Sequence, residues 1–450
     1  MSAPSHPYAC RKAVVLGLGR SGMAAARLLI KCGAEVTVCD SGESAMLAER
    51  AALLRAEGAS VRTGSSAETD PSRYDLAVLS PGIEETTRLV TNVTGKGTPL
   101  IGELELAFTL CPCPLVAITG TNGKTTTTEL TTLMLRGAGL HTASCGNIGT
   151  PLSELLLSGD CWDVLVAEVS SFQLETIRTF RPKVALWLNL SPNHLDRYPS
   201  LEEYRAAKLR IFMNQTGEDF AIVPFGENLP ALKARTISFG LRSLKADLTL
   251  AGTEIRHAGR TLLDLSTTKL QGPHNAANLM AAFGAGIALG ADLRRMADAI
   301  LGYTPPAHRC EFVRERCGMR WINDSKATNL DAMEQAIRSV QGPLILIAGG
   351  KDKGSEFAPI APLVRERVSD AILIGEMRHR IARDWAPVPC ELAESLEEAV
   401  ALAARHAVPG ATVLLSPGTS SYDMFRDYIE RGERFRRLVE ELPESTATAA

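Results

Sequence analysis

The chain has 450 residues, of which 45% are hydrophobic and 22% are charged, and its formal net charge is -3. This length and composition predict a soluble globular protein of about three domains. A slightly negative chain lacks the basic field of nucleic-acid-binding proteins, which excludes nucleic acid as an expected partner.

The N-terminal stretch MSAPSHPYACRK leads into a short apolar run at residues 13–16, which glycines interrupt at once. It resembles neither a signal peptide nor a membrane span, so we expect a cytoplasmic protein with no membrane partner. The ten cysteines include one Cys111-Pro-Cys113 pair but no C-x-x-C motif. Reduced and mostly buried thiols are therefore expected, including Cys145 and Cys310.

Strand-like and helix-like segments alternate along the first hundred residues. Strands are predicted at residues 13–16, 35–40 and 75–80, and helices at 21–31 and 43–57. This alternation is typical of a parallel sheet with crossover helices.

The pattern starts again after the Cys-Pro-Cys-Pro turn at residues 111–114. Strands are predicted at 115–119, 162–168 and 184–190, helices at 124–136, 201–212 and 275–289, and a hairpin lying over the sheet at 247–272. A third unit has strands near Trp321 and at 344–348, 371–375 and 412–415, with helices at 330–340 and 396–405. We expect three α/β domains, with boundaries near residues 102 and 308.

The first glycine-rich turn, V-V-L-G-L-G-R-S-G at residues 14–22, follows a strand and opens a helix. Its three glycines, Gly17, Gly19 and Gly22, let the backbone approach a pyrophosphate, and Asp40 ends the next strand, where an acid takes a ribose hydroxyl. Taken alone, the turn favours a nicotinamide dehydrogenase. The alternative is a tight turn without a ligand, because a lone glycine-rich turn is a weak signal.

The second turn, A-I-T-G-T-N-G-K-T-T-T-T at residues 117–128, departs from the strict P-loop pattern. That pattern requires a glycine where this chain has Ile118. The strand, the glycines, Lys124 and Thr125 nevertheless stand where a P-loop needs them, to cradle phosphates, reach β and γ oxygens and bind Mg²⁺. The alternative is a polar loop before a frayed helix. Two phosphate sites suggest one molecule bound by its diphosphate and another that gives up its γ-phosphoryl group.

The segment G-T-N-G-K-T at residues 120–125 resembles the ATP loop of the Mur ligases, which form amide bonds in peptidoglycan precursor synthesis. Further motifs resemble the branch of that family that adds D-glutamate, in matching order from Gly17 to Phe435. They are G-N-I-G at 146–149, E-V-S-S-F-Q-L-E at 168–175, N-H-L-D-R-Y at 193–198, Y-R-A-A-K at 204–208, H-N-A-A-N at 274–278, H-R at 308–309, N-D-S-K-A-T-N at 323–329 and L-S-P-G at 415–418. The D-N-P-R string of the branches that add diaminopimelate or lysine is absent.

The resemblance implies that the first domain binds the uridine diphosphate end of a substrate instead of NAD, which replaces the dehydrogenase interpretation. The implied reaction has three substrates, UDP-N-acetylmuramoyl-L-alanine, D-glutamate and ATP. The L-alanyl carboxylate attacks the γ-phosphorus, and the amine of D-glutamate then displaces phosphate from the acyl phosphate. The implied substrate contacts in this domain are Gly17, Gly19, Arg20, Ser21, Gly22, Asp40, Ser41, Ser80, Pro81 and Gly82.

Four residues are implied in catalysis, namely Lys124, Glu168, His194 and Lys208. Glu168 would bind one Mg²⁺ with Thr125, and His194 would bind a second. Lys208 would carry a CO₂-derived carbamate, whose oxygens suit Mg²⁺. Without the family, Glu168 could cap the loop at residues 170–171, His194 could be a surface histidine, and Lys208 could be a solvated charge.

The remaining implied contacts divide by ligand. ATP would meet Gly120, Thr121, Asn122, Gly123, Lys124, Thr125, Thr126, Asn275, Asn278, Arg309 and Asp324. Asn147 would lie beside the acyl phosphate, and D-glutamate would meet Lys326, Thr328, Lys353, Ser421 and Tyr428. Two departures stand out: Lys351 adds a second lysine near Lys353, and Tyr428 replaces a common phenylalanine.

Three other functions stay open from the sequence. One is a sister ligase that adds another amino acid. The second is a folylpolyglutamate synthetase, although that function would not explain the glycine-rich turn at residues 17–22. The third is a regulator that senses UDP-sugars without turnover. Such a regulator would not need the two-metal cluster that Glu168, His194 and Lys208 suggest. For the ligase, we expect a monomer whose third domain swings onto the ATP loop, because Arg309 and Asp324 lie beyond the predicted boundary.

Overall fold

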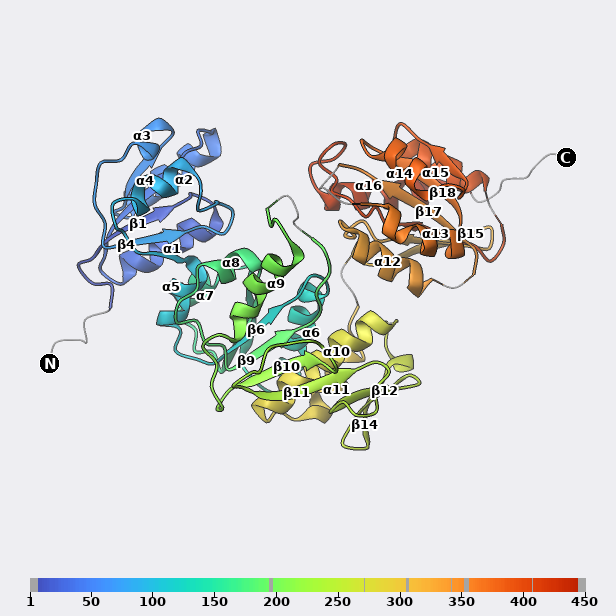
Figure 1. Cartoon of the computed structure of the whole chain (residues 1–450), viewed down its shortest axis with the longest axis horizontal. Coiled ribbons are helices and arrows are strands. Elements are labelled where there is room, and N and C mark those ends of the chain that lie inside the picture. Colours follow the sequence, from blue (N-terminus) through green and yellow to red (C-terminus); the bar gives the residue numbers. More distant parts are fainter. Residues whose placement is uncertain are drawn as a thin grey trace. The chain divides into compact units, whose positions relative to one another are not determined.

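The computed structural model describes residues 7–193, 197–270, 272–304, 307–340, 342–351, 356–406 and 408–443. These residues form three sheets, each with its own helices (Figure 1). The chain divides into two compact units, one made of residues 1–189, 205–267 and 276–301, and the other of residues 190–204, 268–275 and 302–450. The first unit contains the first two sheets. No helix in the described ranges is long and apolar enough to cross a membrane.

The first sheet is parallel and has the strand order β3-β2-β1-β4-β5. Its strands are β1 (Lys12–Leu16), β2 (Glu35–Asp40), β3 (Ser60–Thr63), β4 (Leu76–Leu79) and β5 (Leu100–Gly102). Its helices are α1 (Arg20–Lys31), α2 (Ala45–Ala56), α3 (Ser65–Glu68), α4 (Arg88–Thr94) and α5 (Glu103–Leu110). The predicted strands and helices are confirmed. Strands β3 and β5 were not predicted, because neither shows the continuous buried apolar run of β4.

The central sheet has the order β14-β13-β12-β11-β10-β9-β6-β8-β7. Its strands are β6 (Leu115–Thr119), β7 (Thr142–Gly146), β8 (Val164–Glu168), β9 (Val184–Trp187), β10 (Phe220–Pro224), β11 (Arg235–Gly240), β12 (Leu248–Ala251), β13 (Glu254–His257) and β14 (Arg260–Asp264). Its helices are α6 (Lys124–Gly137), α7 (Leu152–Leu157), α8 (Ser171–Glu175), α9 (Leu201–Leu209), α10 (Pro273–Leu289) and α11 (Leu293–Ile300).

The segment at residues 247–272 does not lie over this sheet as predicted. Strand β12 pairs in parallel with β11, and β13 and β14 then add antiparallel strands at the sheet edge. The expected parallel sheet is therefore mixed. The hairpin continues the sheet because its main-chain groups pair with those of β11, which would otherwise be left as an open edge.

The third sheet has the order β15-β16-β20-β17-β18-β19, with only β15 antiparallel among these strands. Its strands are β15 (Glu311–Arg316), β16 (Met319–Asn323), β17 (Leu344–Gly349), β18 (Val368–Ile374), β19 (Cys390–Leu392) and β20 (Thr412–Leu415). Its helices are α12 (Leu330–Ser339), α13 (Ala361–Arg367), α14 (Arg378–Trp385), α15 (Leu396–Arg405) and α16 (Tyr428–Glu441). The predicted strands and helices of this unit are confirmed.

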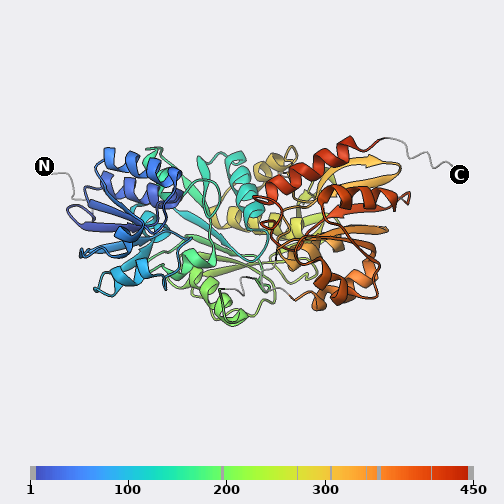
Figure 2. The same cartoon turned by 90° about the horizontal axis from the view of Figure 1, so that it is seen from above.

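Helices cover both faces of the third sheet (Figure 2). Alternate residues of β17 point to opposite faces, so Leu344 and Leu346 pack with α12, α13 and α14, whereas Ile345 and Ile347 pack with α15 and α16. A strand that is buried on both faces therefore has a continuous apolar sequence.

The boundaries at residues 102 and 308 remain predictions.

Glu105 ties helix α5 to the segment that follows α8. Its buried carboxylate accepts main-chain hydrogen bonds from Arg178, Thr179 and Phe180 at 2.9, 2.7 and 2.9 Å. The hydroxyl of Thr179 adds a fourth hydrogen bond of 2.6 Å. A carboxylate that receives several N–H groups stabilises a chain segment that has no regular structure of its own.

We predict that Glu105→Ala lowers the free energy of unfolding by about 3 kcal/mol, because the substitution removes a charged acceptor and leaves its donors unsatisfied. Urea-induced unfolding followed by circular dichroism measures this change. Glu85→Ala, at an exposed position, serves as the control and should change the free energy by less than about 0.5 kcal/mol. Equal effects of the two substitutions would contradict the anchoring role.

Candidate active site

The first glycine-rich turn has the predicted strand-to-helix geometry. Gly17 has a φ of +103°, and a Cβ atom on Gly22 would lie 1.9 Å from the carbonyl oxygen of Gly17. The carboxylate of Asp40 accepts the N–H of Leu18 at 2.7 Å and that of Gly42 at 2.8 Å. Asp40 therefore holds the turn in place. The positions of Asp40 and Ser41 near uracil remain predictions.

The other predicted contacts of this domain surround the same turn. Ser80 follows β4, is buried, and its hydroxyl lies 3.4 Å from the carbonyl oxygen of Gly17. Arg20 begins α1 and extends to the central sheet, where it contacts the carboxylate of Glu154 at 3.0 Å and the carbonyl oxygen of Gly149 at 2.7 Å. Of the remaining members of this set, Gly19 precedes α1, Ser21 lies on α1, and Pro81 and Gly82 lie in the loop after β4.

The second turn follows the fully buried strand β6 and leads directly into α6. Gly123 has a φ of +80°, and a Cβ atom there would lie 2.5 Å from the side-chain oxygen of Asn278. The predicted ATP residue Asn278 is therefore brought against the loop. The Nζ of Lys124 donates to the carbonyl oxygens of Gly120 and Thr121 at 2.9 and 2.8 Å.

Asn189, which was not among the predicted residues, braces this loop. Its side-chain oxygen accepts the N–H groups of Thr121 and Asn122 at 3.1 and 2.9 Å, and its NH₂ group donates to the carbonyl oxygen of Asn122 at 3.1 Å. These two amides are therefore occupied, and the amides that can receive a phosphate begin at Gly123. The sequence does not indicate this role, because its pattern predicts a strand at residues 184–190, whereas β9 ends at Trp187.

Glu168 lies at the carboxyl end of β8 and is 2% exposed. Its Oε1 accepts the side-chain NH₂ of Asn147 at 2.8 Å, whereas its Oε2 has no hydrogen-bond partner in the described part of the chain. The alternative role as a cap of the loop at residues 170–171 is wrong, because Gln173 and Ser170 form a capping box between themselves. A buried carboxylate oxygen without a partner is therefore available to a cation.

Lys208 is not the solvated charge that an isolated helix would suggest. It is 1% exposed, and its Nζ donates to the carbonyl oxygen of Gly120 at 2.9 Å. Burial lowers the pKa of Lys208 well below its ordinary value, the nearby charge of Lys124 lowers it further, and Glu168 acts in the opposite direction. The neutral amine is thereby favoured.

The loop, Asn147, Glu168 and Lys208 thus gather at the carboxyl ends of β6, β7 and β8, where ligands of open α/β sheets bind. Thr125 and Thr126 lie in the first turn of α6, and Asn275 lies in the first turn of α10. His194 and Lys353 lie outside the described residues.

The predicted D-glutamate residues lie on the third sheet. Lys326 and Thr328 follow β16, Ser421 follows β20 and is 3% exposed, and Tyr428 begins α16. The ammonium of Lys326 lies 3.8 Å from the centre of the Tyr428 ring, a cation–π contact that a phenylalanine would also provide.

Asp324, a predicted ATP residue, is buried at the carboxyl end of β16. Its carboxylate accepts the N–H of Cys310 at 3.1 Å and the hydroxyl of Ser416 at 2.9 Å. Burial raises the pKa of Asp324 to about 7. Arg309 precedes Cys310 directly, so the hydrogen bond from Cys310 fixes the chain beside it.

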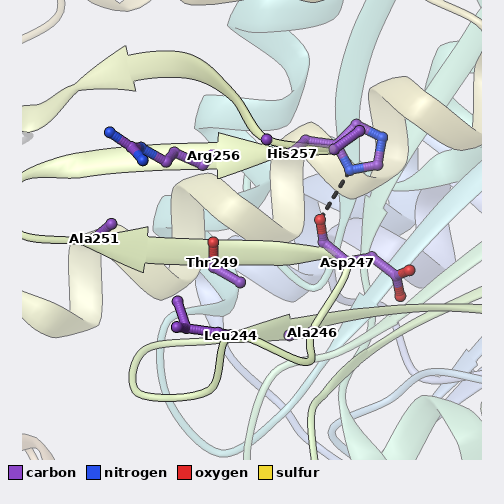
Figure 3. Close-up of a pocket in the computed structure, with 9 residues that line it drawn as sticks. Leu244, Ala246, Asp247, Thr249, Ala251, Arg256 and His257 are labelled. Atoms are coloured by element: carbon purple, nitrogen blue, oxygen red, sulfur yellow. Dashed lines mark hydrogen bonds between the residues drawn. The ribbon is translucent and has the colours of Figure 1, made fainter.

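A separate pocket lies at the hairpin of β12 and β13 (Figure 3). It has a volume of about 460 Å³ and is lined by residues that include Leu244, Thr249 and Arg256. One ring nitrogen of His257 lies 2.9 Å from the carbonyl oxygen of Asp247 and fixes one wall. None of the predicted site residues lines this pocket.

Known sequence families match all three regions of the chain. The pattern of the Mur ligase MurD-like N-terminal domain matches residues 11–102, that of the Mur ligase middle domain residues 118–286, and that of the Mur ligase glutamate ligase domain residues 308–418. A UDP-N-acetylmuramoylalanine--D-glutamate ligase from Trichlorobacter lovleyi is 43% identical over 444 residues, covering 96% of this chain and 99% of the relative. The chain belongs to the Mur ligase family. Another ligase of the same name, from Pelobacter propionicus, is 44% identical and covers 96% of this Mur ligase and 99% of its own length.

Solved structures show the same architecture. A pseudomurein peptide ligase type C from Methanothermus fervidus matches with a TM-score of 0.62 at 18% identity, covering 96% of this Mur ligase and 100% of that chain. The UDP-N-acetylmuramate-alanine ligase MurC from Thermotoga maritima matches with a TM-score of 0.59 at 18% identity, covering 96% of this Mur ligase and 99% of that chain. At such identities the likeness concerns the fold, which is the expected three-domain α/β architecture. Mur ligases are ATP-dependent amide ligases that use Mg²⁺.

We predict that Asn189→Ala in this Mur ligase raises the KM for ATP about tenfold or more, which corresponds to about 1.4 kcal/mol. The reason is that the N–H of Asn122 loses its acceptor, the N–H of Thr121 keeps only the main-chain oxygen of Asn189, and the loop loses its shape. Steady-state phosphate release at varied ATP concentration measures the effect. Asn214→Ala is the matched control, because Asn214 also donates to main-chain carbonyls, those of Arg178 and Phe180, but away from the loop. A KM for ATP that stays unchanged in Asn189→Ala would rule out the brace.

Proposed function

We propose that this chain joins D-glutamate to UDP-N-acetylmuramoyl-L-alanine, with ATP converted to ADP and phosphate, in the synthesis of peptidoglycan precursors. The observation that carries the proposal is identity of 43% and 44%, over nearly the whole chain, to ligases named for this reaction. The geometry supports it, because one compact unit contains both glycine-rich turns, one for a nucleotide-linked substrate and one for ATP. The cytoplasmic location and the monomeric state stay predictions.

The first chemical step brings a carboxylate to the γ-phosphorus of ATP, so negative charges accumulate and must be neutralised. Lys124 provides a cation within the loop, and the N–H groups from Gly123 onward lie at the positive end of the α6 dipole. These groups stabilise charge on the phosphoryl oxygens while the acyl phosphate forms. Asn147 supports the step indirectly, because it orients Glu168 through a hydrogen bond of 2.8 Å.

The donor set at the carboxyl ends of β6 and β8 fits Mg²⁺, a hard cation that prefers oxygen ligands. The test is the buried Oε2 of Glu168, which has no hydrogen-bond partner among the described residues. Glu168 and the hydroxyl of Thr125 would hold the ion, which when bound neutralises charge on the phosphates. The described residues contain no group of three His, Cys, Asp or Glu side chains that could hold a metal. Phosphate oxygens, water or a modified side chain could complete the coordination of the ion.

Lys208 is suited to be that modified side chain. It is buried beside Gly120, and both Lys124 and Glu168 act on its charge. A neutral amine attacks CO₂ to form an N–C bond, and the proton that leaves the nitrogen passes to solvent. The resulting carbamate is negative and has two oxygens, so it would offset the charge of Lys124 and could bind Mg²⁺. A second Mg²⁺ at His194 stays a proposal from the resemblance.

D-glutamate has two carboxylates, which call for cationic and hydroxyl donors. Lys326, Thr328 and Ser421 provide such donors on neighbouring loops of the third sheet. Either Lys351 or Lys353 would add another cation. The amine of D-glutamate then attacks the acyl carbon, and phosphate leaves from the tetrahedral intermediate.

We predict that the purified protein releases phosphate from ATP only when UDP-N-acetylmuramoyl-L-alanine and D-glutamate are both present. The reason is that the acyl phosphate needs the first substrate and its turnover needs the amine of the second. A phosphate assay with each substrate omitted in turn measures the dependence. Equal release with L-lysine or diaminopimelate in place of D-glutamate would refute the assigned amino acid.

We predict that Lys208→Ala lowers kcat at least about a hundredfold while ATP binding is largely kept, because the substitution removes charge stabilisation in the transition state. Added short carboxylic acids should restore part of the activity by supplying the missing oxygens. Nucleotide titration and phosphate release measure the two effects, with the exposed Lys245→Ala as control. Turnover that is unchanged in Lys208→Ala would exclude the carbamate role.

A further inference from the structure

Three neighbouring loops carry the residues proposed to bind D-glutamate. They follow β16, β20 and β17, which are adjacent in the third sheet and have parallel directions, so the loops lie at one sheet edge. The first loop carries Lys326 and Thr328, the second Ser421, and the third Lys351. The described residues of these loops lie outside the helices and strands, so other contacts must hold their positions relative to one another.

Arg431, on helix α16, lies beneath two of these loops. Its side chain is 1% exposed. Its Nε donates to the hydroxyl oxygen of Ser325 at 3.0 Å, and Nη2 donates to the carbonyl oxygens of Ser325 and Thr419 at 2.9 and 3.4 Å. The hydroxyl of Ser325 in turn donates to the carbonyl oxygen of Tyr428 at 2.7 Å. One guanidinium therefore joins the loops after β16 and β20 to the start of α16.

The third loop packs against the same point. A Cβ atom on Gly350 would lie 2.3 Å from the carbonyl oxygen of Ser420 and 3.4 Å from Nη1 of Arg431. The N–H of Lys351 donates to that carbonyl oxygen at 3.0 Å. The loop after β17 thus rests directly on the loop after β20, above Arg431.

Burying the guanidinium of Arg431 costs free energy, because the cation loses its hydration. Within the described ranges no carboxylate lies in salt-bridge contact with Arg431, and the charges of Asp423 and Asp324 act on it from a greater distance. Neither its Nη1 nor the hydroxyl of Thr419 has a hydrogen-bond partner among these residues. A buried cation without a carboxylate partner adds little to stability compared with an apolar side chain of similar size. Its planar group of five donors, in contrast, can fix several acceptors in one geometry.

We propose that Arg431 is a positioning residue for the amino-acid substrate, which it serves by fixing the loops that carry Lys326, Ser421 and Lys351. It acts through Ser325 and Thr419 and does not touch the substrate. The inference rests on the proposed function, since it takes these loops as the D-glutamate site. A residue that only stabilised the fold would affect all substrates alike.

The test compares Arg431→Lys, which keeps the charge but loses the planar group, with Ser325→Ala, which removes one link and leaves little empty volume. The KM values for D-glutamate, ATP and UDP-N-acetylmuramoyl-L-alanine are measured in the full-length protein, with circular dichroism and thermal melting as checks of folding. We expect the KM for D-glutamate to rise about tenfold or more in Arg431→Lys and less in Ser325→Ala, with the other two KM values within about twofold.

Arg434→Lys is the matched control, because Arg434 lies on the same helix but is exposed and pairs with Glu397. It should leave all three KM values unchanged. The double variant Arg431→Lys with Ser325→Ala should raise the KM for D-glutamate by less than the product of the single effects, because both residues belong to one network.

A KM for D-glutamate that is unchanged in both single variants, or three KM values that rise together, would overturn the proposal. If Arg431→Lys does not fold, Ser325→Ala decides by the same criterion. If the wild-type protein releases phosphate with another amino acid instead of D-glutamate, the proposed function fails, and the KM for that amino acid then provides the same comparison.

Discussion

The carbonyl oxygen of Gly120 accepts hydrogen bonds from two lysines, Lys124 and Lys208, each at 2.9 Å. Two ammonium groups that share one buried oxygen repel each other, which favours the neutral form of one amine. Lys208 is the deeper of the two, and burial already favours its neutral form. The rest of the central site depends on this pairing, because it fixes the loop and places a reactive nitrogen near Glu168.

The sequence predicted the loops better than the residues that support them. Glycines, lysine and threonine in a fixed order identify a phosphate loop locally, because each contributes through its own backbone or side chain. Asn189 and Arg431 could not be found in this way. Each acts on segments that are distant along the chain, and neither stands in a motif that signals its role. Burial was equally hidden for Lys208, since a helix with the pattern LEEYRAAKL does not show which face covers a loop.

Strand length does not explain the errors in the fold, because the four-residue strand β4 was predicted whereas the six-residue strands β11 and β15 were not. Long apolar strands such as β6 and β17 were predictable because they are buried on both faces and bounded by glycine or polar turns. Strands β3 and β5 are only partly buried and show no such continuous run. The hairpin of β13 and β14 alternates like a separate element although it extends the central sheet. Local sequence patterns thus indicate the helices and strands. Which strands pair with one another depends on the sheet edges that are available in the folded chain.

The crowding around Gly123 and Gly350 has a consequence for inhibitors. At both positions a side chain would collide with neighbouring atoms, at 2.5 Å and 2.3 Å. A compound that hydrogen-bonds to the main chain there would face a surface that point mutation cannot readily reshape. Resistance would then have to arise at the periphery of the loops, where side chains are free to vary.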